Sequence, residues 1–282
     1  MLLGANYHTH TFRCKHATGD AVDYARHAAG GGCRILGFTD HAPMPDGRWS
    51  NFRMALTELD DYEHAIDAAR VQYPNMTVLT GLECEWHDSV DSFYRDEILG
   101  RRGYDYLIGA CHYTELDGKW KNSFEDLGDS GSLTAYARQC IRTMESGLFT
   151  FIAHPDIIGC SNPEWTPETE ACARELCAAS VAMAVPFELN GYGFRKPWID
   201  CAAGKRPAYP WPPFWEIAAE YGVRVVLNSD AHQPQDVLAG CDELTALRDR
   251  FGLIEADLSR LNEPVPKTAR RRTRTGPPGP TP

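Results

Sequence analysis

The chain has 282 residues, of which 43% are hydrophobic and 24% are charged, a composition typical of a folded globular protein. It contains no run of eighteen apolar residues, so we expect no membrane-spanning helix and no membrane partner. The first residues lack the basic and apolar regions of a secretory signal peptide, and the ten cysteines form no C-x-x-C pair. These features together predict a cytoplasmic protein with reduced thiols.

The net charge of −11 is distributed unevenly along the chain. The last residues, KTARRRTRTGPPGPTP (267–282), hold five basic residues and no acid, so the rest of the chain carries a net charge of −16. An acidic body disfavours long nucleic acids, which bind through cations that neutralise phosphates. No Pro/Gly/Ser-rich linker divides the remaining sequence, which predicts one domain over residues 1–264 and a disordered basic tail over 265–282.

Short apolar or β-branched segments alternate with helix-like segments along the chain. The predicted strands lie at 2–8, 35–41, 76–84, 106–113, 149–155, 185–191 and 223–232. The predicted helices, in which apolar residues recur three and four positions apart, lie at 20–30, 56–73, 132–147, 166–183 and 212–222. This alternation predicts an α/β fold with right-handed crossovers and a mainly parallel sheet. Irregular segments at 42–55, 114–131 and 191–212 each follow a strand, and we expect the last, rich in aromatic and basic residues, to be a substrate loop.

Histidine and acidic residues lie at or soon after the carboxyl ends of six of the seven predicted strands. They are His8, His10, His16, His41, Glu83, His112, His154, Asp230 and His232. In a closed parallel barrel these ends meet on one face, and the pairs His8–His10 and Asp230–His232 each project to one side because their members are two residues apart. Imidazoles and carboxylates are ligands for Zn, Fe or Mn, and nine are too many for one ion. The sequence therefore predicts a multinuclear metal centre, with Cys14 as a further candidate ligand.

This order of residues resembles the signature of the PHP (polymerase and histidinol phosphatase) superfamily: H-x-H, a third His, then D-H, E, H, H and D-x-H. All nine positions are present between residues 6 and 232. The segments YHTHTFRCKHATGD, GFTDHAPMP, FIAHPDII and FELNGYGFRKP also resemble those of the PHP-type histidinol-phosphatases. The resemblance implies a distorted TIM-like (β/α)7 barrel with three divalent metal ions (zinc, manganese or iron) at the carboxyl face of its strands.

The resemblance further implies how the ligands divide among the three ions. One ion would be held by His8, His10, Glu83 and Asp230. A second would be held by Glu83, His112 and His154, with Glu83 bridging the two. The third would be held by His16, His41 and His232. The strand pattern by itself supports the pooled set of ligands but not this division.

A cluster of cations at the bottom of a cleft suits a small phosphorylated substrate. The resemblance implies a phosphomonoesterase, in particular a histidinol-phosphatase, which hydrolyses L-histidinol phosphate to L-histidinol and phosphate in histidine biosynthesis. A metal-bridging hydroxide would attack phosphorus, with Asp230 and His232 as catalytic ligands and Asp230 taking the proton. Arg195, after the sixth strand, is predicted to bind the phosphate bidentately, whereas we expect Lys196 to be a solvated lysine.

Two alternatives stay open, and the sequence does not indicate an oligomeric state. The first is a PHP-type phosphoesterase acting on another small phosphate ester, a nucleotide or a cyclic phosphodiester, because the segments GACHYTE and GLECEWHD differ from a typical histidinol-phosphatase. The second is a non-catalytic, metal-binding regulatory domain. The complete set of nine ligands disfavours it, since a degenerate site would be expected to lose ligands.

Overall fold

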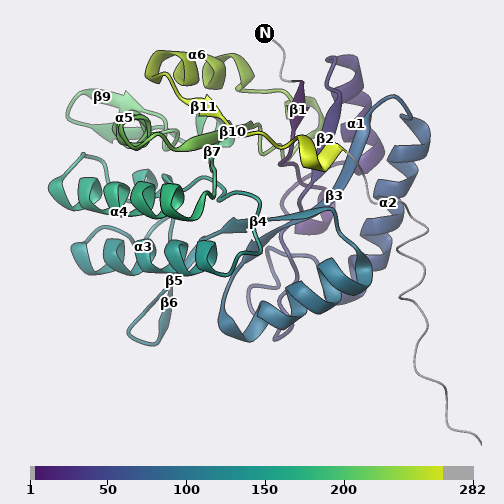
Figure 1. The fold of residues 1–282 in the computed structure, drawn as a ribbon, viewed down its shortest axis with the longest axis horizontal. Coiled ribbons are helices and arrows are strands. Elements are labelled where there is room, and N and C mark those ends of the chain that lie inside the picture. Colours follow the sequence, from purple (N-terminus) through teal and green to yellow (C-terminus); the bar gives the residue numbers. More distant parts are fainter. Residues whose placement is uncertain (1–3, 263–282) are drawn as a thin grey trace, which may run out of the picture.

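The computed structural model describes residues 4–262, and its centre is a parallel β-sheet that curls (Figure 1). Its strands are β1 (Ala5–Asn6), β2 (Ile35–Phe38), β3 (Thr77–Glu85), β4 (Tyr106–Ala110), β7 (Phe187–Asn190), β10 (Arg224–Asn228) and β11 (Ile254–Glu255). Four of them pair in the order β1-β2-β3-β4, and three pair in the order β11-β10-β7. Every one of these pairings is parallel.

Single β-bridges connect these two groups of strands. Ile152 bridges to Gly109 of β4 on one side and to Phe187 of β7 on the other. At the β1 end of the four-stranded group, Thr9, which follows β1, bridges to Ala231, which follows β10. Since all the pairings are parallel, the carboxyl ends of strands from both halves of the chain open onto the same end of the curled sheet.

Within residues 4–262, six α-helices and one π-helix lie outside the sheet (Figure 1). The α-helices are α1 (Ala21–Gly30), α2 (Leu59–Gln72), α3 (Ser130–Glu145), α4 (Pro167–Met183), α5 (Pro212–Tyr221) and α6 (Cys241–Phe251). The π-helix, η4 (Phe93–Arg102), connects β3 to β4. Helix α1 packs against α2, and α4 packs between α3 and α5, so the helices shield the outer face of the strands from water.

Side chains that cap the first turn determine where several helices begin. The side chains of Asp129 and Thr166 accept backbone N–H groups at the starts of α3 and α4, and Asp20 and Asp23 form a capping box at the start of α1. Helix α4 also has Pro167 at its first position, where the missing N–H costs no hydrogen bond. The helices were predicted from the spacing of their apolar residues, and these caps add to that pattern the residues at which the helices begin.

The predicted alternation of strands and helices is confirmed, with a few differences. The segment 149–155 contributes only the bridges of Ile152, because the chain turns into the left-handed region at His154 with φ 30°. Helices η4 and α6 were missed, as were two antiparallel hairpins inside the expected loops: β5 (Tyr113–Leu116) with β6 (Lys119–Asn122), and β8 (Ile199–Cys201) with β9 (Gly204–Arg206). The predicted tail, 265–282, lies outside the described residues.

The interior of the curled sheet is filled around Tyr106 of β4. Its hydroxyl donates to the backbone oxygen of Tyr7 at 2.6 Å, which crosses the inside of the sheet. Gly37 of β2 and Gly81 of β3 make room for its ring, since a Cβ atom at either position would overlap the tyrosine side chain. This packed layer forms the floor beneath the open end of the sheet. Within residues 4–262, no helix is long and apolar enough to cross a membrane.

Candidate metal centre

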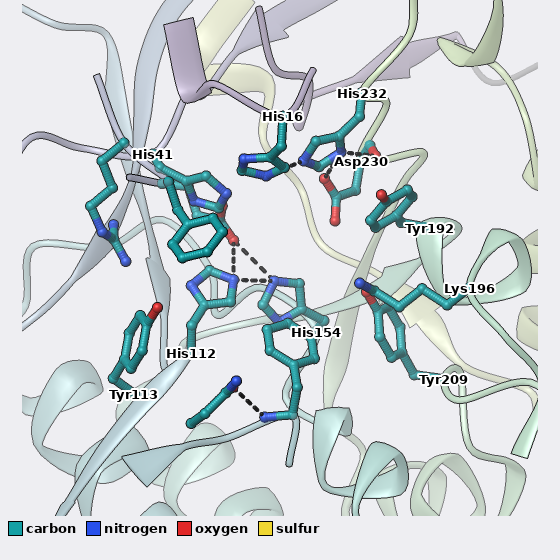
Figure 2. A pocket seen from close by; sticks show the side chains of 15 residues that line it. His16, His41, His112, Tyr113, His154, Tyr192, Lys196, Tyr209, Asp230 and His232 are labelled. Atoms are coloured by element: carbon teal, nitrogen blue, oxygen red, sulfur yellow. Dashed lines mark hydrogen bonds and ion pairs between the residues drawn. The ribbon is translucent and has the colours of Figure 1, made fainter. Parts of the chain in front are cut away.

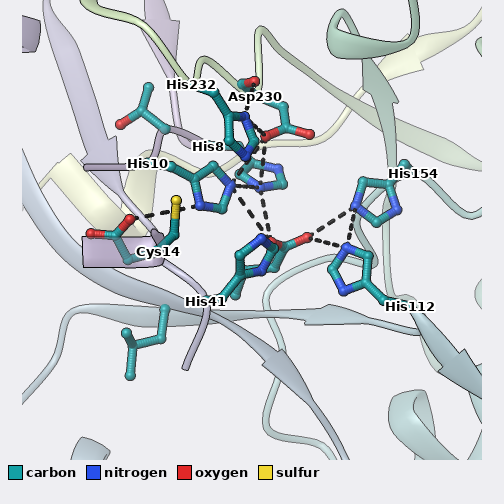
Figure 3. Close-up of polar contacts among 12 residues, drawn as sticks. His8, His10, Cys14, His41, His112, His154, Asp230 and His232 are labelled. Carbon is teal, nitrogen blue, oxygen red and sulfur yellow. Dashed lines mark hydrogen bonds and ion pairs between the residues drawn. The ribbon is translucent and has the colours of Figure 1, made fainter. Parts of the chain in front are cut away.

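The nine predicted ligands come together at the open end of the curled sheet. Eight of them are buried: His8, His10, His41, Glu83, His112, His154, Asp230 and His232. His16, in the loop after β1, is exposed at the rim. Figure 3 shows most of them converging from strands far apart in the sequence. The structure therefore brings all nine side chains to one place, and their role as metal ligands stays a prediction.

Four ligand atoms meet in a first group next to β1. The Nε2 atoms of His8 and His10 are 3.0 Å apart, and they lie 3.5 and 3.1 Å from Oδ1 of Asp230. Oε2 of Glu83 is 3.6 Å from each of the two nitrogens. Atoms that bind one ion at about 2.0–2.2 Å are separated by roughly these distances in a tetrahedron. The four residues are thus spaced as ligands of a single divalent cation.

A second group shares Glu83 with the first. Its other oxygen, Oε1, lies 2.9 Å from Nε2 of His154 and 3.3 Å from Nε2 of His112 (Figure 3). The two imidazole nitrogens are 3.2 Å apart. The carboxylate of Glu83 therefore directs one oxygen to each group, the position that a bridging ligand requires.

The third group lies nearest the rim. The Nε2 atoms of His16 and His232 are 3.1 Å apart, and the His16 ring stacks on that of His41 with 5.2 Å between ring centroids. Cys14 also brings its sulfur close to the ligand atoms of His16 and His232. Burial raises the pKa of the Cys14 thiol far above its usual range, so as a free side chain it is neutral.

His41 takes a position between the groups. Its Nδ1 atom lies 2.7 Å from Oε2 of Glu83, and its ligand atoms cluster with those of Glu83 and His112 as well as with those of His10 and His232. The structure brings His41 into the centre but does not separate it from the first two groups. Its assignment to a third ion stays a prediction.

The donor set fits divalent cations on three counts. Among the described residues, Oε2 of Glu83 and Oδ1 of Asp230 are buried and accept no hydrogen bond, although an unpaired buried carboxylate oxygen is costly. Although burial opposes ionisation, the neighbouring imidazoles hold the pKa of both carboxyls well below the usual range. Burial lowers the pKa of His41 and His232 well below normal and that of His16 to about 4, so these rings are neutral and can ligate.

Two further carboxylates, which the sequence analysis missed, orient histidines of the centre. Oε1 of Glu188 accepts from Nδ1 of His8 at 2.8 Å, and Oε1 of Glu85 accepts from Nδ1 of His112 at 2.6 Å. Each bond turns Nε2 of its histidine toward the ligand group, the arrangement common around metal-bound imidazoles. Glu85 could have been found, because it lies two residues after Glu83 on β3 and so shares its face.

Two of the predicted ligands have backbones in the left-handed region. His154 has φ 30° and Asp230 has φ 49°, values that non-glycine residues rarely adopt. His154 follows the buried bridging segment around Ile152, Asp230 follows β10, and both bring their side chains to the centre. Strained backbone at two ligands of one site is typical of positions held for function.

The centre forms the floor and one wall of a pocket (Figure 2). Seven of the nine predicted ligands line it, all except His8 and His10. The remaining lining is mainly aromatic and basic: Phe52, Arg53, Tyr113, Asn122, Phe124, Tyr192, Lys196 and Tyr209. Tyr192 stacks on the His232 ring and Phe124 on the His112 ring. Apart from Tyr113, these residues come from the three irregular segments that follow strands, and Tyr192, Lys196 and Tyr209 come from the segment 191–212 that the sequence predicted as a substrate loop.

Arg195, the predicted phosphate ligand, has other partners. Its Nη2 atom donates to the backbone oxygens of Ser229 at 2.6 Å and Asp230 at 3.2 Å. Its Nη1 atom donates to the oxygens of Gly191 at 3.1 Å and Ala239 at 3.3 Å. Arg195 therefore lies beside the site, bracing the chain segment that carries Asp230, and the residue on the pocket wall is its neighbour Lys196.

Several known proteins are similar to this chain over most of its length. A protein of Deinococcus radiodurans named "Probable histidinol-phosphatase" is 33% identical over 256 residues, which are 87% of this chain and 93% of the relative. A histidinol-phosphatase of Bacillus subtilis is 25% identical over 260 residues, 82% of this chain and 94% of the relative.

A solved structure has a similar fold, and a family model matches part of the sequence. A histidinol phosphate phosphatase from Lactococcus lactis, solved with zinc, L-histidinol and phosphate, superposes with a TM-score of 0.69 at 16% identity, covering 89% of this chain and 94% of its own. The model of the PHP domain matches residues 6–191, which is more than half of the chain and contains seven of the nine ligands. By this match and the 33% identity, the chain belongs to the PHP family.

Proposed function

We propose that this protein is a metal-dependent phosphomonoesterase and that its substrate is L-histidinol phosphate. The observation that carries the proposal is the buried carboxylate of Glu83, whose two oxygens each face a separate group of histidine nitrogens. A bridged pair of cations is suited to hydrolysis of a phosphate ester. The names of the Deinococcus and Bacillus relatives support the choice of substrate.

We infer three ions, divided among the nine ligands as the family resemblance implies, in a distorted (β/α)7 barrel. The seven parallel segments joined through Ile152 and through Thr9 support the barrel. The grouped ligand atoms support at least two ions, and His16 and His232 support a third. Zinc, manganese and iron all accept this mixture of imidazole and carboxylate ligands.

Divalent cations bound by these ligands would neutralise phosphate oxygens and lower the pKa of a bound water to about 7. The protein supplies the group that takes the proton. Asn190 donates from Nδ2 to Oδ2 of Asp230 at 3.0 Å, which fixes the carboxylate and leaves Oδ1 facing the ligand nitrogens. We assign the carboxylate of Asp230 as the proton acceptor, with His232 beside it as a ligand that limits where the carboxylate can turn.

The pocket lining is compatible with a flat, aromatic leaving alcohol. Phe124 and Tyr192 stack on histidines of the centre, and Tyr113 stacks on Trp49 with 4.0 Å between ring centroids. Rings of this kind bind an imidazole by offset or edge-to-face contacts, and the tyrosine hydroxyls add hydrogen-bonding partners. This wall suits the histidinol part of the proposed substrate, because imidazole presents both a face and polar edges.

Hydrolysis assays on protein of known metal content test this proposal. L-Histidinol phosphate should be hydrolysed with a higher kcat/KM than phenyl phosphate, and both with a higher value than bis(p-nitrophenyl) phosphate or a cyclic nucleotide. A preference for the diesters would favour the alternative phosphoesterase instead. Absence of turnover with fully loaded metal sites would favour the non-catalytic alternative, and fewer than two ions per chain would contradict a multinuclear centre.

A further inference from the structure

Lys196 is a charged side chain on the pocket wall to which the proposed function gives no role. It is half-buried at the end of the turn formed by Tyr192–Arg195. Its Nζ atom lies 4.6 Å from the centroid of the Tyr192 ring and 4.8 Å from that of the Phe124 ring. Figure 2 shows the amine between Tyr192 and Tyr209, directed toward His154 and the interior of the pocket.

The two rings that flank Lys196 themselves pack on the metal centre. Tyr192 stacks on His232 with 4.5 Å between centroids, and Phe124 stacks on His112 with 5.6 Å. The amine is thus one aromatic ring away from ligands in two different groups. A phosphate held between these groups would lie within reach of its N–H donors.

In the part of the chain that the structure describes, Lys196 differs from Arg53, the other Lys or Arg side chain that lines the pocket, because Arg53 is paired with a carboxylate and Lys196 is not. Nη2 of Arg53 donates to Oε1 of Glu85 at 2.8 Å, so that charge is already neutralised. Lys196 makes neither a hydrogen bond nor an ion pair with any carboxylate of residues 4–262, and its aromatic neighbours stabilise a cation without neutralising it. Within the described residues, it is the lining cation that retains a net charge for a ligand.

We propose that Lys196, and not Arg195, binds the phosphate of the substrate. The inference rests on the proposed phosphatase function and deepens it by naming the residue that contacts the transferred group. The lysine ammonium acts as a point charge that donates to phosphate oxygens while the remaining oxygens face the metal centre. Arg195 is unsuited to this role because its guanidinium already donates to four backbone carbonyls.

The test measures binding of inorganic phosphate to metal-loaded protein by titration calorimetry. Lys196→Met keeps the length of the side chain between the rings but removes the charge, and Lys196→Arg keeps the charge. Lys205→Met is the matched control, since Lys205 lies in the same segment, pairs with Asp200 at 3.4 Å and does not line the pocket. We expect Lys196→Met to raise the Kd for phosphate about 10- to 100-fold, Lys196→Arg to restore part of the affinity and Lys205→Met to leave it unchanged.

Metal content is measured on each variant alongside phosphate binding. A Lys196→Met protein that retains its metal and binds phosphate like the wild type would overturn the proposal, and so would a variant that loses metal and phosphate together. A wild type that binds no phosphate in its loaded form would also overturn it. If the wild type binds phosphate but hydrolyses no monoester, the proposed function is wrong. The comparison of Kd values would still decide whether Lys196 binds phosphate.

Discussion

Glu85 and His112 are joined by a 2.6 Å hydrogen bond from Nδ1 to Oε1, and the same oxygen also accepts from Nη2 of Arg53 at 2.8 Å. All three residues are buried. The charges of Glu83 and Glu85 outweigh the effect of burial and raise the pKa of His112 to about 10. One carboxylate therefore connects the metal centre to the wall of the substrate pocket, and it fixes the direction in which the His112 ring presents Nε2.

Glu85→Gln should weaken metal binding without removing a ligand. The amide keeps the shape of the side chain but loses the charge that orients His112, and loss of such a partner typically lowers metal affinity 10- to 100-fold. Competition with a coloured chelator would measure the change. Glu115→Gln, on exposed β5, is the control and should bind metal like the wild type. Equal affinities for the two variants would show that the Glu85 contact does not support the metal site.

Removing metal should lower the stability of the fold. Bound cations would stabilise the oxygens of Glu83 and Asp230 that are buried and accept no hydrogen bond, and a ligand that binds only the folded state adds about 2.7 kcal/mol when it is present at 100 times its Kd. Thermal unfolding with and without EDTA should show a lower Tm for the stripped protein. Adding back zinc or manganese should restore it, and an unchanged Tm in EDTA would contradict the metal assignment.

Asp230→Asn should reduce kcat by about 10²- to 10⁴-fold, because the amide cannot accept a proton and the group is assigned as the base. Asn190 donates to Oδ2 of Asp230 at 3.0 Å and holds the carboxylate in place. Steady-state kinetics with saturating metal would measure the loss. Asp236→Asn, at a partly buried carboxyl 3.7 Å from Nε of Arg195, serves as a control for charge near this segment. If both variants kept wild-type kcat, Asp230 could not be the proton acceptor.

Arg195→Ala should act on stability first. The guanidinium donates to backbone oxygens of Gly191, Ser229, Asp230 and Ala239, so its loss leaves acceptors without a donor and should reduce the free energy of unfolding by about 2 kcal/mol or more. Urea unfolding of the metal-loaded variant would measure this. A higher KM at unchanged stability would instead support the phosphate-binding role that the sequence predicted for Arg195.

Gly37→Ala should destabilise the floor of the site. A Cβ atom at this position would overlap the hydroxyl of Tyr106, which is bonded to Tyr7, and overpacking of this kind costs about 1–3 kcal/mol. Gly30→Ala, at the end of α1, meets nothing within 4 Å and should be neutral or slightly stabilising. Urea unfolding curves would compare the two. Similar stabilities would mean that Tyr106 can move aside at little cost.

The sequence by itself located the candidate ligands of this protein. Parallel strands present their carboxyl ends on one face whatever the details of packing, so residues such as His41, Glu83 and His154 could be assigned to one site from their places after apolar segments. Local patterns also located five helices, because apolar residues three and four positions apart lie on one face of a helix. The positions of strand ends and of helices depend on residues that are close together in the sequence.

Only the tertiary structure decided which side chains serve the ligands and which face the substrate. Arg195 and Lys196 are adjacent, and the sequence favoured Arg195 as the phosphate ligand. In the structure Lys196 lines the pocket, whereas Arg195 is held by carbonyls 34 and 35 residues away at Ser229 and Asp230. In the same way, Glu188 reaches His8 across 180 residues of sequence. Contacts between such distant segments depend on how the sheet curls. No local pattern around His8 or around Lys196 contains that information.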